Sequence, residues 1–340
     1  MTTIRTIEVS CPLCGSDDAM HLFEAVDRLH GIEGRFRYVR CRSCELVYMN
    51  PQVAPESIGH LYPESYAPHA DKSQTSRKAL MAVRDGLHKI PLVGTELKRW
   101  TDARVMAPLF RRLSVGRRLL DVGCGSGAFL AAARAATGCE VQGVDISTHA
   151  VRTARMRYGV DVFEGPITEA PLADDSFDAI TAWWYLEHIA NPNEAVAAMS
   201  RLLKEGGTCV LGVPSFDSAF ARRFRDRWYH LDCPRHLCIW SPATMRRLLE
   251  LHGLNVTRIF HDRSPWGLLG SLQYQRYGDN TDPKRRNRIR QSVLLWLLLL
   301  PATIVVSLLR RSDIIVVYAQ KRTAGTRAGA GRDGRDGPSI

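Results

Sequence analysis

The stretch LLDVGCGSG at residues 119–127 constrains the fold of this chain more than any other feature of the sequence. Glycines occupy every second position, at Gly123, Gly125 and Gly127, after an apolar run that predicts a strand and before an alanine-rich run that predicts a helix. Such a turn lets a ligand lie against the backbone N–H groups at a helix N-terminus. The stretch therefore predicts a ligand-binding loop in an α/β fold.

Two acidic residues near this loop indicate the class of ligand. Asp121 stands two residues before the first glycine, where a carboxylate would repel the pyrophosphate of a dinucleotide. S-adenosylmethionine (SAM) has no phosphate, and its zwitterionic methionine end needs a polar contact near the loop. Asp145 ends the next predicted strand, where a carboxylate can accept hydrogen bonds from ribose hydroxyls. The two acids favour SAM over NAD.

Strand-like and helix-like segments alternate from residue 117 to residue 214, which predicts a parallel sheet with helices on both faces. The segment 193–207 predicts a helix that is stopped by its two final glycines. A further helix is expected over 241–253, because this segment begins with Ser and Pro and ends in Gly. Late strands are expected at 254–262 and 312–321.

The segments LLDVGCGSG, VQGVDIS, DDSFDAIT, YLEHIANP and RLLKEGGTCVLGVP resemble, in order, the successive motifs of class I SAM-dependent methyltransferases. The resemblance covers residues 115–321. It implies a Rossmann-like seven-stranded sheet whose last strand, at 312–321, runs antiparallel. It also implies that Gly123 and Gly125 line the methionine end of SAM and that Asp145 binds the ribose.

The same resemblance places Pro166 and Ile167 at the turn that flanks adenine, although an Asp common near that turn is missing from EGPITEA. Trp183 and Trp184 follow the fourth strand, where they either stack on SAM or substrate or pack in the core. The predicted cofactor-binding residues are Asp121, Gly123, Gly125, Gly127, Asp145, Ile146, Ile167 and Trp183.

Two CxxC pairs, CPLC at 11–14 and CRSC at 41–44, indicate a structural zinc site. Each pair points two thiolates at one ion, and two pairs complete a tetrahedron. Four cysteine ligands, Cys11, Cys14, Cys41 and Cys44, leave no open position for catalysis. The layout resembles methyltransferases that carry a cysteine-rich N-terminal module, including sugar C-methyltransferases and members found with surface-polysaccharide genes. This resemblance implies a glycosyl acceptor.

The segment WYHLDCPRHLCIWSP at 228–242 holds the acid–base candidates. Transfer of a methyl group to oxygen or carbon needs a base, and a neutral histidine suits this role. His236 matches an H-x-x-x-aromatic-Ser element that carries a catalytic histidine in the sugar C-methyltransferases. Tyr229 and His230 are second choices, and His188 in YLEHI is a further candidate by family analogy. A structural role is the alternative for His230 and His236, and a positioning role is the alternative for His188.

The apolar run at 293–309 has no charged residue and is flanked by KRRNRIR and RR. It is short for a membrane span, and both of its neighbouring strands should belong to one sheet. A segment that dips into a membrane surface is the preferred interpretation, and a buried helix or dimer interface is the alternative. Much of the net charge of +11 lies in KRRNRIR at 284–290, ARRFRDR at 221–227 and the C-terminal tail, with no aromatic-interleaved basic motif typical of nucleic-acid binding.

These observations predict a zinc-binding module at 1–60, a linker and lead-in helix at 61–114, a methyltransferase domain at 115–321 with a hydrophobic insertion at 291–311, and a disordered tail at 322–340. We expect a cytoplasmic SAM-dependent enzyme, peripheral on the inner face of the membrane, that methylates a glycosyl or lipid-linked glycan acceptor. The alternatives are an NAD-linked oxidoreductase and a non-catalytic SAM-fold protein that binds partners at the membrane.

Overall fold

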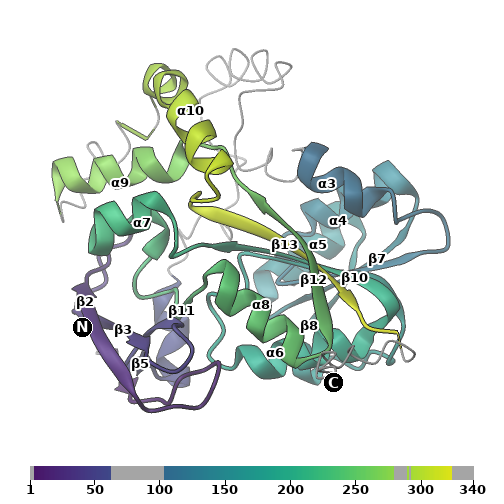
Figure 1. Cartoon of the computed structure of the whole chain (residues 1–340). Coiled ribbons are helices and arrows are strands. Elements are labelled where there is room, and N and C mark those ends of the chain that lie inside the picture. The colour runs from purple at the N-terminus through teal and green to yellow at the C-terminus, as the bar shows by residue number, and fades with distance from the viewer. Residues whose placement is uncertain (1–3, 63–102, 279–288, 291, 324–340) are drawn as a thin grey trace, which may run out of the picture.

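The computed structural model describes residues 4–62, 103–278, 289–290 and 292–323 (Figure 1). Most of the predicted linker and of the predicted tail lies outside these residues, as does most of the basic run at 284–290. Within the described ranges the chain forms a large α/β part and a smaller N-terminal β part, which pack against each other.

A seven-stranded sheet forms the centre of the α/β part. The strand β13 pairs antiparallel with both of its neighbours, whereas the five strands from β10 to β8 pair in parallel. This arrangement confirms the predicted fold class, including the antiparallel last strand. In spatial order the strands are β12 (Leu254–His261), β13 (Ile314–Lys321), β10 (Leu203–Pro214), β9 (Phe177–Trp183), β6 (Arg118–Val122), β7 (Glu140–Asp145) and β8 (Asp161–Glu164).

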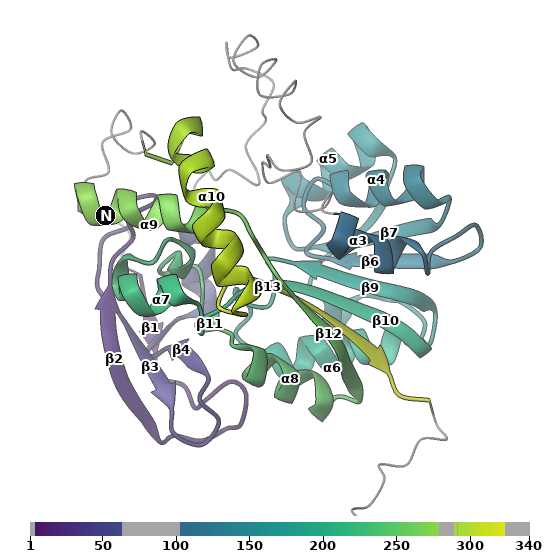
Figure 2. The same cartoon turned by 45° about the horizontal axis from the view of Figure 1, so that its top comes forward.

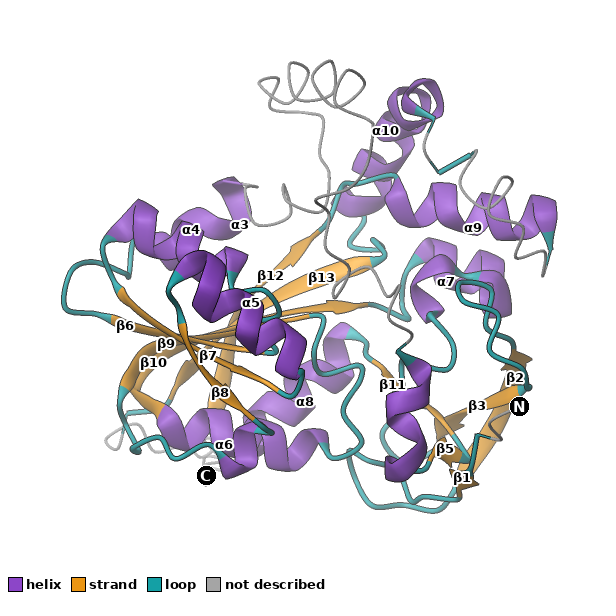
Figure 3. Ribbon diagram, turned by 180° about the vertical axis from the view of Figure 1, so that it is seen from behind, coloured by secondary structure: helices purple, strands orange, loops and turns teal. Residues whose placement is uncertain are grey.

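Helices cover both faces of this sheet (Figure 3). On one face, α3 (Ala103–Phe110), α4 (Ala128–Thr137) and α5 (Thr148–Tyr158) bury apolar side chains such as those of Val105, Phe129 and Val151 in one core cluster. On the other face, α6 (Pro192–Leu202) and α8 (Pro242–Leu251) contribute Val196 and Met245 to a second cluster. The alternation of strands and helices was thus predicted correctly.

The start of α8 agrees with the capping residues in its sequence, whereas the end of α6 does not agree with the glycines that follow it. Ser241 caps α8, as its sequence predicts, and the structure adds Thr244 as the second member of a capping box. By contrast, α6 ends at Leu202, before Gly206 and Gly207, and β10 begins at the next residue. The two glycines lie in a bulged part of this strand, because the register against β9 shifts between Leu203 and Thr208.

The N-terminal part is a small β structure that includes a strand from far along the chain. Its four-stranded sheet has the order β11 (Cys238–Ile239), β4 (Val47–Met49), β3 (Phe36–Cys41) and β2 (Ala19–Ala25), and β1 (Thr6–Ile7) pairs with β5 (Gln52–Val53). In the register of β11 and β4, Cys238 faces Tyr48. The segment that carries His236 therefore leads directly into the N-terminal sheet.

Three more helices lie together beside the end of the sheet where β12 ends and β13 begins (Figure 2). They are α7 (Ala219–Phe224), α9 (Trp266–Tyr277) and α10 (Val293–Leu308), and α10 corresponds to the apolar run. None of the helices in the described ranges is both long enough and apolar enough to cross a bilayer. Short 3₁₀ helices are η1 (Pro55–Leu61), η3 (Ile167–Glu169), η4 (Arg225–Arg227) and η5 (Tyr229–Leu231).

Candidate active site

The glycine loop joins β6 to α4 and adopts a conformation that favours glycine. Gly123, Gly125 and Gly127 all have positive φ angles, of 71°, 53° and 74°. A Cβ atom on Gly127 would lie 2.9 Å from Ala154, so this glycine allows α4 and α5 to pack closely. A Cβ atom on Gly125 would meet nothing within 4 Å, so the backbone at Gly125 is open to a ligand.

Asp145 at the end of β7 holds this loop in place. One of its carboxylate oxygens accepts a hydrogen bond from the N–H of Gly125 at 2.8 Å, and the other accepts one from the N–H of Ser147 at 2.9 Å. Because a carboxylate offers about four lone-pair positions, both oxygens can still accept further donors, such as ribose hydroxyls. The next residue, Ile146, is 69% exposed, so an apolar surface adjoins these acceptors.

Asp121 lies beneath the loop and is buried. The Thr181 hydroxyl donates a hydrogen bond of 2.6 Å to its carboxyl group. Burial is the main cause that raises the pKa of Asp121 to about 8, and the nearby Asp145 adds to the increase. The carboxyl group is therefore largely protonated at neutral pH, and a bound cation would favour its charged form.

The remaining predicted cofactor residues lie deeper. Ile167 is buried in the core cluster that contains α6. Trp183 packs edge-on against Phe129 with ring centroids 5.5 Å apart, and a Cβ atom on Gly212 would meet its ring at 2.7 Å. Trp184 has a positive φ of 56° and stacks on His230 with ring centroids 5.8 Å apart. Of the two tryptophans, Trp183 thus lies in the core and Trp184 lies against a candidate catalytic residue.

His236 and His188 meet in a buried cluster, with ring centroids 4.7 Å apart. Nδ1 of His236 lies 2.9 Å from the carbonyl oxygen of His230, which can only accept, so Nδ1 carries the proton of the neutral ring. Nε2 of His236 is then the basic nitrogen, and it lies 3.9 Å from Asp232. Burial lowers the pKa of His236, so the neutral form predominates, whereas Asp232 favours the protonated form.

His188 is held in a similar way. Its Nδ1 lies 3.1 Å from both the Arg235 carbonyl and the Tyr62 hydroxyl. Burial, with an added contribution from His236, lowers the pKa of His188 to about 3. Three residues earlier, Tyr185 lies over the glycine loop, where a Cβ atom on Gly123 would meet its ring at 2.8 Å. The segment 185–188 therefore connects the loop to the histidine cluster.

The second-choice candidates Tyr229 and His230 pack against α9. A Cβ atom on Gly267 would lie 2.6 Å from the His230 ring, and one on Gly270 would lie 2.3 Å from the Tyr229 ring. These two glycines therefore let α9 approach both side chains. The Tyr229 hydroxyl accepts a hydrogen bond from Arg290, which also lies over the Tyr229 ring at 5.3 Å.

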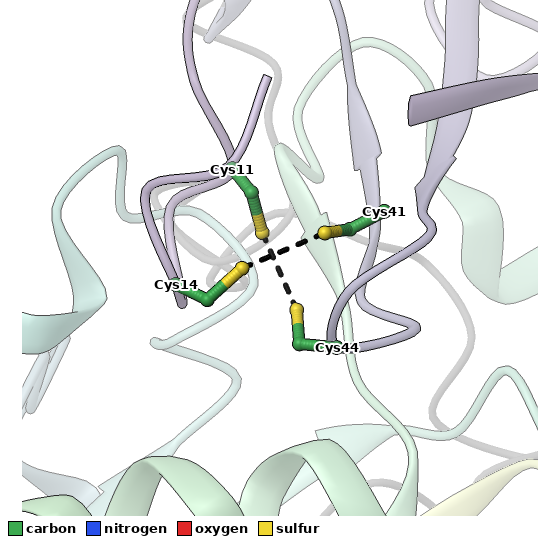
Figure 4. A group of neighbouring side chains, drawn as sticks. All are labelled: Cys11, Cys14, Cys41 and Cys44. Carbon is green, nitrogen blue, oxygen red and sulfur yellow. Dashed lines mark hydrogen bonds between the residues drawn. The ribbon is translucent and has the colours of Figure 1, made fainter. Parts of the chain in front are cut away.

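Two groups of side chains in the described residues could hold a metal ion. The four cysteines of the CxxC pairs gather with their sulfur atoms within 4.8 Å of one another (Figure 4). Glu187, His188 and His236 also place one ligand atom each within this distance. The cysteine group consists of the four residues that were predicted to bind zinc. The second group lies within the histidine cluster.

Comparisons with known proteins identify the fold around these residues. Residues 97–259 match the family model described as a methyltransferase domain. This chain has the fold of the class I SAM-dependent methyltransferases. The match confirms the predicted enzyme class at the level of the domain, and the strand order of the sheet agrees with it. The predicted SAM-binding loop at 123–127 and Asp145 lie within the matched residues.

Curated relatives match part of the domain. The ubiquinone biosynthesis O-methyltransferase of Alkalilimnicola ehrlichii is 46% identical over 101 residues, which cover 28% of this chain and 40% of that protein. The protein of the same name from Thiobacillus denitrificans is 39% identical over 116 residues, which cover 32% of this chain and 46% of that protein. This chain therefore matches less than half the length of each relative.

A solved structure with a similar fold is the geranyl diphosphate C-methyltransferase from Streptomyces coelicolor A3(2). It is 16% identical, with a TM-score of 0.47, and the match covers 77% of this chain and 90% of that chain.

The comparisons correct one sequence-based expectation. The predicted glycosyl or lipid-linked glycan acceptor is wrong, because the relatives are named ubiquinone biosynthesis O-methyltransferases. The prediction depended on the cysteine module and the segment around His236, and neither the family match nor the relatives connect these features with sugars. The glycine loop and the acidic residues were sufficient to predict the methyltransferase fold from the sequence.

Several residues of the site were not predicted from the sequence. Tyr38 donates a hydrogen bond of 2.9 Å to the backbone oxygen of His236, and Tyr62 contacts His188 across 126 positions of the chain. Arg235 is buried between Asp27 and Asp232, with contacts of 2.8 and 2.7 Å. The proximity of Glu187 to His188 in YLEHI was visible in the sequence, whereas the other contacts depend on the packing of the N-terminal part.

Proposed function

We propose that this chain transfers a methyl group from SAM to a hydroxyl oxygen of a quinone precursor. The name shared by the curated relatives supports the acceptor class and the oxygen as the methylated atom. The buried His236 gives the proposal its main support. A backbone carbonyl fixes the proton on its Nδ1, so Nε2 is left as a base. The aromatic rings of Tyr185, over the glycine loop, and of Trp184, stacked on His230, suit a planar acceptor.

The loop residues are well suited to hold SAM. The open backbone at Gly125 gives room for the ligand, and Asp145 offers acceptors for the ribose beside the exposed Ile146. Asp121 supplies a carboxyl group near the loop for the ammonium of the methionine end. When bound, SAM supplies an electrophilic methyl group, whose bond to sulfur breaks with its electron pair going to sulfur as the carbon–oxygen bond forms.

The histidine cluster would perform the proton transfer. Nε2 of His236 accepts the hydroxyl proton of the acceptor, and the lone pair of the oxygen then forms the new bond to carbon. Asp232, 3.9 Å away, stabilises the imidazolium that results. His188, fixed by Arg235 and Tyr62, keeps the His236 ring in position through its edge-on contact. Most of the acceleration would come from holding the acceptor in line with the methyl group.

We also propose that the four cysteines hold a structural zinc ion. The sulfur atoms of Cys11 and Cys44, and those of Cys14 and Cys41, lie 3.5 Å apart, which is far longer than a disulfide bond (Figure 4). Four sulfurs at about 2.3 Å from a central zinc ion would be separated by roughly 3.8 Å in a regular tetrahedron. The four thiolates would thus cross-link the two turns at 11–14 and 41–44.

The methyl-transfer proposal is tested with labelled SAM and a ubiquinone precursor that bears a free ring hydroxyl. His236→Ala should lower turnover by about 10²–10⁴-fold, because it removes the general base, and should leave SAM affinity unchanged. His21→Ala, at an exposed position on β2, is the matched control and should keep full turnover. Undiminished turnover of the His236 variant would exclude this histidine as the base. Binding of SAM without transfer to any hydroxylated quinone precursor by the wild type would overturn the acceptor.

A further inference from the structure

Helix α10 has an inverted distribution of polar and apolar side chains. The buried residues on its inner side are Trp296, Thr303 and Ser307. The Thr303 hydroxyl donates a hydrogen bond of 2.7 Å to the Arg263 carbonyl, and the Ser307 hydroxyl donates one of 2.9 Å to the His261 carbonyl. The helix is thus attached to the molecule by two hydroxyl groups together with the buried Trp296 and the partly buried Leu299, whereas an ordinary surface helix is attached mainly through apolar side chains.

The outer side of α10 is apolar. Its exposed positions recur every three or four residues, so their side chains form one continuous stripe along the helix. Figure 2 shows α10 on the outside of the molecule, beside α9. The exposed large apolar residues on this helix and just after it are Val293, Leu294, Leu297, Leu298, Val305, Leu308 and Leu309. An apolar stripe of this size on a surface is typical of a site that contacts lipid or another protein.

A basic groove adjoins the C-terminal end of this helix. It has a volume of about 1010 Å³ and lies between α8 and β12. Arg246, Arg247, Arg258 and Arg310 line it, against a single acidic residue, Glu250, which pairs with Arg246 at 3.5 Å. The exposed Arg310 lines this groove and directly follows Leu309, so the basic groove and the apolar stripe adjoin at this residue.

We propose that the apolar stripe of α10 and the basic groove together dock the protein on an anionic lipid bilayer. The stripe enters the interface between headgroups and acyl chains, and the arginines contact the lipid phosphates. The helix lies along the surface and does not cross it. Its 16 residues reach about 24 Å, and β12 and β13, between which it is inserted, belong to one sheet.

Charge favours a bilayer over a second copy of this chain. Arg290 precedes α10, and Arg310 and Arg311 follow it. In a two-fold dimer packed through the stripe, either orientation of the two helices would bring basic ends together. An anionic surface instead neutralises both ends and the groove. The same charge pattern that opposes self-association therefore favours binding to acidic lipids.

The test is flotation of the full chain with vesicles of phosphatidylcholine alone or mixed with phosphatidylglycerol. Wild type should float with the mixed vesicles and only weakly with the neutral ones. Leu298→Glu should lower the partition coefficient about tenfold or more, because it places a charge in the apolar stripe. Met156→Glu, at an 81% exposed position on α5, is the matched control and should float like wild type.

Arg247→Ala and Arg258→Ala should each weaken binding to the mixed vesicles about fivefold, and neither should alter binding to the neutral ones. Arg152→Ala, on the exposed side of α5, is their control. Equal thermal unfolding midpoints would show that the variants are folded, and Leu298→Gln replaces Leu298→Glu if the latter is not. A wild type that never floats, or a Leu298 variant that floats like wild type, would overturn the proposal. A dimer that Leu298→Glu dissociates, without vesicle binding, would assign the stripe to a second copy instead.

Discussion

Among single residues, Asp121 allows the most specific prediction about SAM binding. Burial raises its pKa to about 8, so at pH 6.5 the carboxyl group is protonated before the ligand arrives. The ammonium of SAM would favour the carboxylate, and binding at this pH should release about one proton. Calorimetric titrations in buffers of different ionisation enthalpy measure this release. Asp121→Asn should bind SAM more weakly and release no proton, and an unchanged release would exclude Asp121 as the group that titrates.

The glycine loop, the acid that ends the next strand and the two cysteine pairs could be recognised from residue types and spacing, because each of these signals is local in the sequence. Their assignment to SAM, to its ribose and to zinc stays a prediction. The histidine cluster was predicted only in part. Nothing near His188 indicates that Tyr62 reaches it, and nothing near Arg235 indicates its buried contact with Asp27, 208 positions away. Such contacts are set by how the N-terminal part packs on the domain, which residue spacing does not encode.

At the scale of elements, the strand β3 joins the proposed zinc site to the proposed base. Cys41 ends this strand, and Tyr38 within it donates a hydrogen bond to the backbone oxygen of His236. Cys41→Ser should therefore lose zinc by elemental analysis and lose turnover with it, because metal binding and local folding are coupled. Tyr38→Phe should keep zinc and SAM affinity but lower kcat about tenfold, because it removes one hydrogen bond that positions His236.

Tyr158→Phe on α5 is the control for this pair of variants and should change neither zinc content nor kcat. If Tyr38→Phe retains full kcat, the N-terminal part does not position the base. Element boundaries show the same division between local and distant causes. The Ser cap of α8 fixed its start as predicted, whereas β10 extends back to Leu203 because pairing with β9 replaces the last turn expected for α6.

At the scale of the whole molecule, buried polar groups join the N-terminal part to the methyltransferase domain. Arg235 lies between Asp27 and Asp232, and the pKa of Asp232 is lowered to about 2, chiefly by the charge of Arg235 acting against burial. The helices and sheet could be predicted from periodicity, but this junction could not, because β11 pairs with β4 across almost 200 positions. The same junction encloses two neutral histidines, the buried His236 and the half-buried His188, so the stability of the molecule should depend on pH.

The sign of this dependence follows from the direction of the pKa shifts. The pKa of His188 falls from its ordinary value of 6.5 to about 3 in the folded chain, and that of His236 is also lowered, in both cases mainly by burial. The unfolded chain therefore binds protons below pH 6.5 that the folded chain does not. The contribution of these two histidines to the free energy of unfolding is fully present above this pH and decreases as the pH falls toward 3. Each such proton contributes a slope of about 1.4 kcal/mol per pH unit.

His188→Gln should remove one of these protons, because glutamine does not titrate. Denaturant unfolding between pH 6 and pH 4 should then show a slope of the unfolding free energy against pH that is about 1.4 kcal/mol per pH unit smaller than in the wild type. His21→Gln, at an exposed position, should leave the slope unchanged. An equal slope in wild type and His188→Gln would mean that His188 is already protonated in the folded chain, which would contradict its burial as a neutral partner of His236.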